Sequence, residues 1–259
     1  MKALIVATRE LKLGFRNPWV YTFLVLFSFF VLTILLIQSH TALEGYTYTT
    51  GSLLNLLLYL LPLMTLVTGS FAITAEKEEG GWQLLSTYSL SGLALIVGKY
   101  AGLVAVMFSI VGFSFGFAGL AGGLVGRGFS VNTLALFYVA SLLIVFVFLA
   151  ISTLIGSLAH NRWQALTFGV GVWFVAVLAW PTLLISVLGF LPYPMIKPAL
   201  QALVFLNPAE LVRIFMIVQI GGGASFGPEY AAWIQWLNQP AGWWVFLGVC
   251  LLWILVCLG

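Results

Sequence analysis

The stretch Thr133–Ala159, TLALFYVASLLIVFVFLAISTLIGSLA, contains no charged side chain. A helix that crosses the roughly 30 Å hydrocarbon core of a bilayer needs about 20 such apolar residues. A membrane-spanning β-strand would instead alternate apolar and polar residues over about 10 positions, and this stretch does not. It therefore predicts a membrane-spanning α-helix.

The same pattern recurs along the chain. Five further stretches are long, apolar and free of Asp, Glu, Lys and Arg: 19–39, 53–75, 100–125, 163–188 and 241 to at least 257. We therefore predict an all-α, polytopic membrane protein with six transmembrane helices, built as a single transmembrane domain over residues 1–259.

The composition agrees with a surface that faces lipid. Hydrophobic residues make up 62% of the chain and charged residues 7%, against about 25% charged residues in an average soluble domain. The aromatic content of 15% also excludes a disordered chain, because disordered chains are poor in aromatic residues. The net charge of +3 comes from basic residues near the spans and gives no reason to expect a nucleic-acid partner.

The distribution of basic residues predicts the orientation, because loops on the cytoplasmic side carry more Lys and Arg. One side has Lys2, Arg9, Lys12, Arg16, Lys77, Lys99 and Arg162, and the other has Arg127, Lys197 and Arg213. Both termini are therefore expected in the cytoplasm, with the protein in the plasma (inner) membrane.

Residues 2–17 are expected to form an amphipathic elbow helix on the membrane surface. At helical spacing, one side carries Leu4, Ile5, Leu11 and Phe15, and the other carries Arg9, Glu10 and Lys12. The dipeptide Asn17-Pro18 should end this helix. Two interpretations remain open: a plain positive-inside anchor, or an elbow with a mechanical role in which Arg9, Lys12 and Arg16 take part.

The segment 76–99 is the most informative polar stretch. It begins Glu76-Lys77-Glu78-Glu79-Gly80-Gly81-Trp82, in which acidic residues gather at the end of a span and two glycines break the helix. An apolar, leucine-rich stretch follows and ends at Gly98-Lys99. A cytoplasmic loop this apolar should lie on the membrane or be covered by a protein partner.

This segment resembles the first cytoplasmic loop of ABC type-2 transporter permeases. The matching residues are Glu76, Glu78, Gly80, Leu84, Leu85, Leu90, Ser91, Gly98 and Lys99, whereas Gly81 and Ser89 depart from the usual Thr and Pro. The resemblance implies a coupling helix that sits in a groove of a separate ATPase subunit. It makes Glu76, Glu78, Gly80, Trp82, Leu84, Leu85, Leu90 and Lys99 the candidate ATPase-coupling residues.

The resemblance also implies an assembly. It predicts a homodimer or pseudo-dimer of permease copies with two ATPase subunits, on which ATP and Mg²⁺ bind. The path between protomers would be built mostly by the second and fifth spans, and the candidate lining residues are Asn55, Thr65, Thr68, Ser70 and Thr74.

No catalytic, cofactor or metal site is predicted in this chain itself. The sequence Gly92…Gly98-Lys99-Tyr100 has the wrong spacing for a phosphate-binding loop and lacks the Ser or Thr after the lysine. Cys250 and Cys257 lie roughly 10 Å apart along a helix axis, which is too far for one disulfide or one metal ion. The chain is therefore not expected to be an enzyme.

The third span contains glycines spaced four apart: Gly98 and Gly102, Gly112 and Gly116, and Gly122 and Gly126. Such spacing allows helix backbones to approach closely. Packing within one protomer and packing between protomers both remain open.

The segment 189–240 is expected to be an external loop with short helices. Asn207 should cap a helix that begins at Pro208, with Glu210 and Arg213 placed to pair, and a glycine triplet should end it. A second short helix should begin at Pro228-Glu229 and, with later tryptophans, form an aromatic belt. The loop could dock a periplasmic or external partner or serve as a lid.

The resemblance implies an ATP-driven permease, and within the family the segment from Asn207 to Arg213 and the Gly-Gly-Trp turn are most similar to permeases of nitrous-oxide-reductase maturation systems. Such systems serve the assembly of a copper enzyme. The alternatives are a subunit of a drug, lipid or polysaccharide exporter, or a scaffold that relays ATPase motion without transport. An intramembrane enzyme is disfavoured because the spans offer no acid, base or metal cluster.

Overall fold

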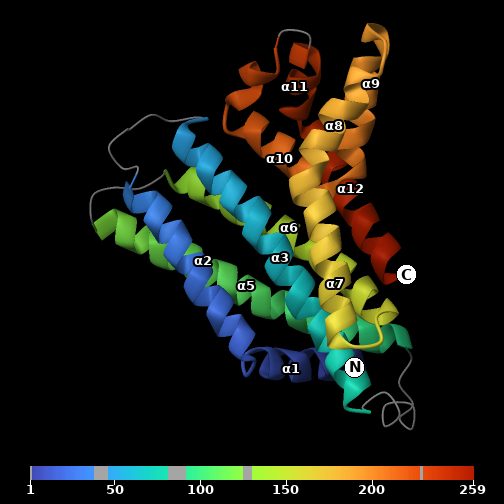
Figure 1. The fold of residues 1–259 in the computed structure, drawn as a ribbon. Coiled ribbons are helices and arrows are strands. Elements are labelled where there is room, and N and C mark those ends of the chain that lie inside the picture. The colour runs from blue at the N-terminus through green and yellow to red at the C-terminus, as the bar shows by residue number, and fades with distance from the viewer. Residues whose placement is uncertain (1, 38–45, 81–91, 125–129, 228–229) are drawn as a thin grey trace.

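The computed structural model describes residues 2–37, 46–80, 92–124, 130–227 and 230–259, and every element within these ranges is a helix (Figure 1). The elements in chain order are α1 Lys2–Gly14, α2 Pro18–Ile37, α3 Tyr48–Glu78, α5 Gly92–Leu124, α6 Val131–Leu158, α7 Arg162–Trp173, the π-helix η1 Phe174–Ala179, α8 Trp180–Gly189, α9 Tyr193–Leu206, α10 Pro208–Gln219, the short 3₁₀ helix η2 Gly222–Phe226, α11 Ala231–Leu237 and α12 Pro240–Leu258. The all-α prediction is confirmed.

Several helices are long and apolar enough to cross a membrane. In the described part of the chain five pass by length and composition: α3, α5, α6, α12 and the continuous run Arg162–Gly189 formed by α7, η1 and α8. Two bent pairs raise the number to as many as seven: α1 with α2, at 69°, and α9 with α10, at 112°. The chain is an integral membrane protein, and each of the six apolar stretches of the sequence overlaps one of these helices.

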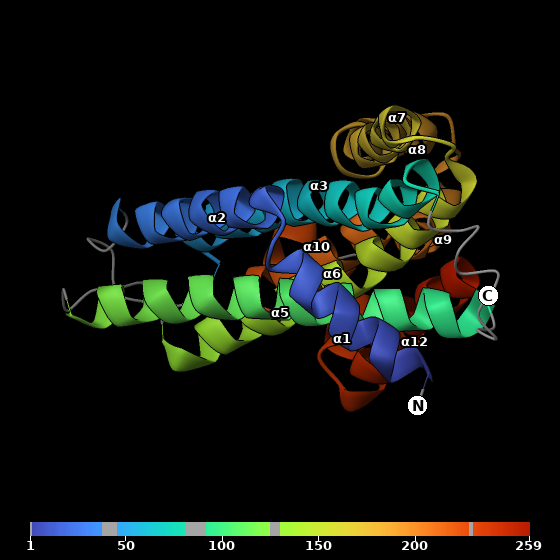
Figure 2. The same ribbon diagram turned by 90° about the horizontal axis from the view of Figure 1, so that it is seen from below.

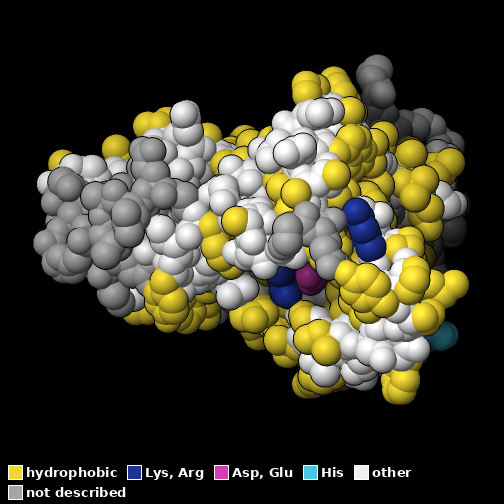
Figure 3. Space-filling model, turned by 90° about the horizontal axis from the view of Figure 1, so that it is seen from above, with side chains coloured by type: hydrophobic (Ala, Val, Ile, Leu, Met, Phe, Trp, Pro, Cys, Tyr) yellow, Lys and Arg dark blue, Asp and Glu magenta, His cyan; other side chains and the backbone are white. Residues whose placement is uncertain are grey.

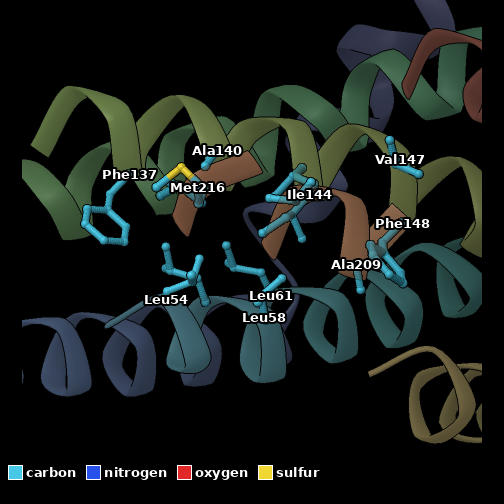
Figure 4. Packing of buried hydrophobic residues seen from close by; sticks show 14 of the residues in the cluster. Leu54, Leu58, Leu61, Phe137, Ala140, Ile144, Val147, Phe148, Ala209 and Met216 are labelled. Carbon is cyan, nitrogen blue, oxygen red and sulfur yellow. The ribbon is translucent and has the colours of Figure 1, made fainter. Parts of the chain in front are cut away.

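Helices α3 and α6 form the centre of the bundle. Their facing side chains interdigitate, and α10 closes the same core from one side (Figure 4). The contributing residues include Leu54, Leu58 and Leu61 of α3, Phe137, Ile144 and Phe148 of α6, and Ala209 and Met216 of α10. Within a bilayer such contacts stabilise the bundle by van der Waals packing.

Helix α5 begins earlier than the sequence indicated. We expected a short helix that closes at Gly98-Lys99, followed by a span from Tyr100, but α5 runs without a break from Gly92. Its 33 residues extend roughly 50 Å at 1.5 Å per residue, well beyond the roughly 30 Å of hydrocarbon. The expected loop 76–99 is therefore helical at both ends.

Helix α1 lies across the first turns of α5, and Figure 2 shows the crossing from below. Glycines make the close approach possible: a Cβ atom at Gly98 would lie 2.7 Å from the carbonyl oxygen of Ala3, and one at Gly102 would lie 2.6 Å from that of Ala7. The first glycine pair therefore packs within the protomer, and neither position can carry a larger residue without moving α1.

The orientation of α1 differs from the expected one. Glu10, assigned to the polar side, is 4% exposed and faces α5 with Val6 and Gly14. Leu4 and Ile5, assigned to the apolar side of a helix on the membrane surface, are exposed. The reason is that the glycines of α5 and the charge of Lys99 select the face of α1 that packs inward. The predicted end of the helix is confirmed, because α1 stops at Gly14 and α2 begins at Pro18.

The segment after the fifth span folds back into the bundle. Helix α9 was not predicted from the sequence. Helix α10 was expected as a short external helix, but most of its residues are buried against α6, α9 and α12. Trp233, expected in an aromatic belt, is also buried in the core cluster, whereas Trp244 is exposed. The predicted second helix is present as α11, and its expected start at Pro228-Glu229 lies outside the described residues.

Candidate functional site

The end of α3 joins four other helices, and we call residues 76–79, the last residues of the helix and its C-cap Glu79, the α3 hub. The helix ends here because Gly80 adopts a left-handed conformation, with φ of +72°, which favours glycine. The backbone N–H of Glu79 donates to the carbonyl of Ala75, 3.0 Å away. The predicted helix break is confirmed at Gly80, the first of the two glycines, and Gly81 lies outside the described residues.

Glu76 connects the hub to α1 and α5. Its carboxylate lies 2.8 Å from Nη1 of Arg9 and 3.0 Å from Nζ of Lys99. Lys99 also donates to the carboxylate of Glu10 and, at 3.2 Å, to the carbonyl of Ala72. The side chains of Lys99, Glu10 and Glu76 are 3%, 5% and 10% exposed, so these charges are held almost entirely by one another.

Lys77 connects the hub to α6. Its Nζ donates to the carbonyl oxygens of Ser157 at 2.6 Å and Ala159 at 2.8 Å. These carbonyls are at the end of α6 (Val131–Leu158), where the last peptide groups have no helical partner and carry partial negative charge. The lysine thereby fixes the end of α6 to the end of α3.

Glu78 and Glu79 connect the hub to α7. Glu78 accepts a hydrogen bond from the backbone N–H of Arg162 at 2.8 Å, and its other oxygen lies 3.0 Å from Nε of the same arginine. Glu79 accepts from Nη2 of Arg162 at 3.0 Å. These side chains are 34% to 71% exposed, so solvent screens this joint more than the one at Glu76.

Two of the predicted coupling residues, Glu76 and Lys99, meet in this cluster, and Arg9 of the predicted elbow joins them. Glu78 belongs to the joint with α7, and Gly80 forms the turn that ends α3. Lys12 and Arg16 lie on exposed surface. Trp82, Leu84, Leu85 and Leu90 lie outside the described residues.

Sequence reasoning missed the roles of Glu10 and Arg162. For Glu10 a signal existed: Val6, Glu10 and Gly14 are each four apart and therefore share one helix face. For Arg162 the helix signal was also present, because Asn161 caps α7 by accepting from the N–H of Gln164 at 2.8 Å. Which acid faces the first turn of α7 depends on tertiary packing and could not be read from the sequence.

The candidate pathway residues divide into two groups. Asn55 is exposed on α3, whereas Thr65, Thr68 and Thr74 are at most 4% exposed. Each of the three hydroxyls donates to a carbonyl four residues earlier in α3, at 2.6 to 2.9 Å. Within one protomer these hydroxyls are satisfied by the helix, and a path between protomers stays a prediction.

The predicted helix cap and ion pair of α10 are confirmed. Asn207 accepts from the N–H of Ala209 at 2.9 Å, and Arg213 lies 3.2 Å from Glu210. Asn207 also donates at 2.7 Å to the carbonyl of Ala176 in η1. Pro181, five residues after Ala176, has no N–H with which to complete π-type spacing there, so the asparagine supplies a donor to the irregular turn.

The face opposite α1 has few charged side chains, and Figure 3 shows them set among apolar ones. Both cysteines, Cys250 and Cys257, are free and buried. Among the residues that the structure describes, no three His, Cys, Asp or Glu side chains lie close enough to hold a metal ion. The charged groups of the α3 hub are arranged to join helices.

Comparison with known proteins agrees with this architecture. The chain is 29% identical over 228 residues to the probable ABC transporter permease protein NosY of Stutzerimonas stutzeri, covering 85% of this chain and 83% of the relative. It is 30% identical over 232 residues to the protein of the same name from Pseudomonas aeruginosa, covering 86% and 84%. A family model described as ABC-2 family transporter protein matches residues 4–259. The chain therefore belongs to the ABC-2 family of transporter permeases.

Proposed function

We propose that this permease receives motion from a separate ATPase subunit through the segment 76–99 and passes it to four helices through the α3 hub. The observation that carries the proposal is the spacing of Glu76 and Lys99. These residues flank the segment, 23 positions apart in the sequence, yet their charged groups lie 3.0 Å apart. A push on the segment therefore reaches α3 and α5 together.

The hub extends that push to the neighbouring helices. Arg9 and Glu10 join α1, Lys77 joins α6 and Arg162 joins α7. The pairs at Lys99 are shielded from water, and breaking a buried pair is costly, so α1, α3 and α5 would move as one body. Packed helices linked by such ion pairs can carry mechanical coupling from one element to the next.

The burial of Glu76 supports different roles for the predicted coupling residues in this proposal. Because Glu76 is 8% exposed, it transmits motion inside the permease and leaves contact with the ATPase to the leucine-rich residues, Leu84, Leu85 and Leu90. Membership of the ABC-2 family implies such an ATPase partner. We place ATP and Mg²⁺ on that partner, two copies of it in the complex, and the segment on the cytoplasmic side of the inner membrane.

The fifth span is the face that we assign to a second permease copy. Over the run Arg162–Gly189 only 11% of the most apolar window is buried inside the protomer, compared with 67% for α3. Phe168, Phe174 and Leu183 are among the large apolar side chains exposed on it. A dimer would cover part of this surface, and lipid the rest.

The outcome of the motion is either export or movement passed to an external partner. The likeness to proteins named NosY favours the second, with a role in the maturation of a copper enzyme. In that reading the fifth span acts on α10 through the bond between Asn207 and Ala176. Drug, lipid or polysaccharide export is the alternative, and ATP hydrolysis in proteoliposomes without movement of any candidate substrate would count against it.

Two substitutions distinguish residues that contact the ATPase subunit from residues that transmit motion within the permease. Leu85→Ala should weaken binding of the ATPase subunit in a pull-down from detergent. Glu76→Gln should leave binding intact and lower the hydrolysis of ATP that the permease stimulates in nanodiscs, because the neutral amide holds Arg9 and Lys99 less strongly than a carboxylate does.

Glu210→Gln is the matched control for Glu76→Gln, since it makes the same chemical change in the ion pair of α10, at the other end of the molecule. It should leave both binding and stimulated hydrolysis close to those of the unaltered complex. Normal binding together with normal hydrolysis in Leu85→Ala and Glu76→Gln would show that 76–99 is not the coupling segment.

A further inference from the structure

The second half of the fifth span and helix α9 form a hairpin, residues 180–206, which we call the α8–α9 arm. The arm begins directly after η1 and ends directly before Asn207. Its two ends are held together, because Nδ2 of Asn207 donates to the carbonyl of Ala176 in η1 at 2.7 Å. The arm is therefore closed at its base, and Figure 1 shows α8 and α9 side by side beyond that base.

The arm is buried at few positions. Leu184 is the buried residue of α8, and Val204, close to the base, is the buried residue of α9. Ile185, Phe190 and Met195 are 74%, 89% and 57% exposed. The main neighbours of α8 are η1 and α9, whereas α7, the first half of the span, packs along α3. The first half of the span is thus fixed to the bundle, and the second half is held mainly at its base.

The π-helix η1 joins these two halves. Kinks in helices occur where hydrogen-bond spacing changes to five residues and where a proline removes a donor, and both features are present here. Pro181 has no N–H. That N–H would reach the carbonyl of Ala176 at π spacing and the carbonyl of Val177 at α spacing. The backbone is therefore weakened at two consecutive carbonyls, and the side chain of Asn207 supplies a donor to the first.

Two tryptophans flank η1, and their indole N–H groups differ in bonding. Nε1 of Trp173, just before η1, donates to the carbonyl of Tyr59 in α3 at 2.8 Å. Nε1 of Trp180, just after η1, is buried and makes no hydrogen bond within the described part of the chain. A buried donor without a partner is costly. The arrangement that follows η1 is therefore less well stabilised than the one that precedes it.

We propose that η1 is a hinge about which the α8–α9 arm tilts against α7 and α3, and that Asn207 holds the base of the arm closed. Asn207 is itself fixed, because α10, which it caps, is buried in the bundle. When its bond to Ala176 breaks, the span can bend at η1 and Pro181, and α9 can bend at the extended backbone of Asn207, where φ is −121°. Hinges of this kind use a few residues at the ends of elements.

The tilt is a property of the permease alone, so the test uses the full chain in nanodiscs without the ATPase subunit. A trifluoromethyl probe is attached to Met195→Cys on the arm after both native cysteines are replaced by alanine, and fluorine NMR gives the populations of its conformers. Asn207→Ser keeps a residue that caps helices well, but the shorter side chain does not reach Ala176. It should raise the population of a second conformer about fivefold, the effect of losing one hydrogen bond.

Two further variants show where the arm moves. Asn161→Ser makes the same substitution at the cap of α7, outside the arm, and should leave the spectrum unchanged. Pro181→Ala combined with Asn207→Ser returns a backbone N–H to the junction and should lower the population of the second conformer again. A second conformer that Pro181→Ala does not reduce would place the movement at the corner between α9 and α10, and the hinge at η1 would be wrong.

Equal spectra for Asn207→Ser and the unaltered chain would overturn the proposal. A probe on Lys12→Cys of α1 shows whether the change is local. If its signal also changes in Asn207→Ser, the substitution has loosened the whole bundle, and the proposal fails. Neither result affects the coupling through the α3 hub, which is measured separately by ATP hydrolysis.

Discussion

The ammonium group of Lys99 is enclosed by three acceptors: the carboxylates of Glu10 and Glu76 and the carbonyl of Ala72. Two of its donors are used in hydrogen bonds, to Glu10 and to Ala72, and the contact with Glu76 at 3.0 Å is an ion pair. The carboxylate of Glu76 is in turn shared with Arg9. These contacts give partners to a lysine that is 2% exposed inside the bundle, where an unpaired charge would be very costly.

Lys99→Met should destabilise the protein strongly, because it leaves Glu10 and Glu76 buried together with only Arg9 as a cation. Removing one partner of a buried pair costs about 3–5 kcal/mol. Thermal unfolding in detergent, followed by circular dichroism, should show a clear drop in midpoint. Lys12→Met, at an exposed site, should stay within about 0.5 kcal/mol of the unaltered chain.

A second substitution checks the cause of that loss. Lys99→Met combined with Glu10→Gln removes one of the two stranded carboxylates and should recover part of the stability. If the double variant is as unstable as the single one, the loss comes from packing of the lysine stem and the ion pairs contribute little.

At the scale of elements, the contact between α1 and α5 depends on the absence of side chains. The backbone of α1 lies so close to Gly98 and Gly102 that a Cβ atom at either site would meet a carbonyl oxygen at 2.7 Å or less. A carbonyl of a helix cannot rotate away as a side chain can. The position of α1, and with it the pairing of Glu10 with Lys99, therefore depends on these glycines.

Gly102→Ala should push α1 away from α5 and destabilise the chain by about 1–3 kcal/mol, the usual cost of overpacking. Gly116→Ala is the control on the same helix: nothing lies within 4 Å of its Cβ position, and alanine favours a helix over glycine by about 1 kcal/mol. Thermal unfolding should separate the two in opposite directions. Equal effects would contradict the close packing of α1.

The apolar helices could be predicted from the sequence, but the helices against which each of them packs could not. The spans are predicted by the length of the apolar stretches alone. The helix cap at Asn207 and the helix break at the glycines are predicted by the known preferences of these residues for caps and turns. The start of α5 at Gly92 was missed because the charge of Lys99, next to Gly98, resembled the end of a span. That charge is instead paired with Glu10 of α1 inside the bundle. The burial of α10 and the partner of Asn207, 31 positions away, depend on tertiary contacts that no local pattern encodes.

At the scale of the whole molecule, the charged joints gather at the end that carries α1, whereas α9 reaches toward the opposite end (Figure 1). Seven of the ten basic residues were assigned to the α1 side by the sequence, and the rule that cytoplasmic loops are rich in Lys and Arg predicts that this side faces the cytoplasm. The orientation matters because the α3 hub can receive a cytoplasmic ATPase only if this end faces the cytoplasm.

Single cysteines test that orientation, since the chain has only two native cysteines, both buried, and replacing them with alanine gives a clean background. Lys12→Cys on α1 and Met195→Cys on α9 are both at exposed positions. A membrane-impermeant maleimide should label Met195→Cys in intact cells and Lys12→Cys only after permeabilisation. Labelling of Lys12→Cys in intact cells would place the α3 hub on the wrong side of the membrane, and the coupling proposal would fail with it.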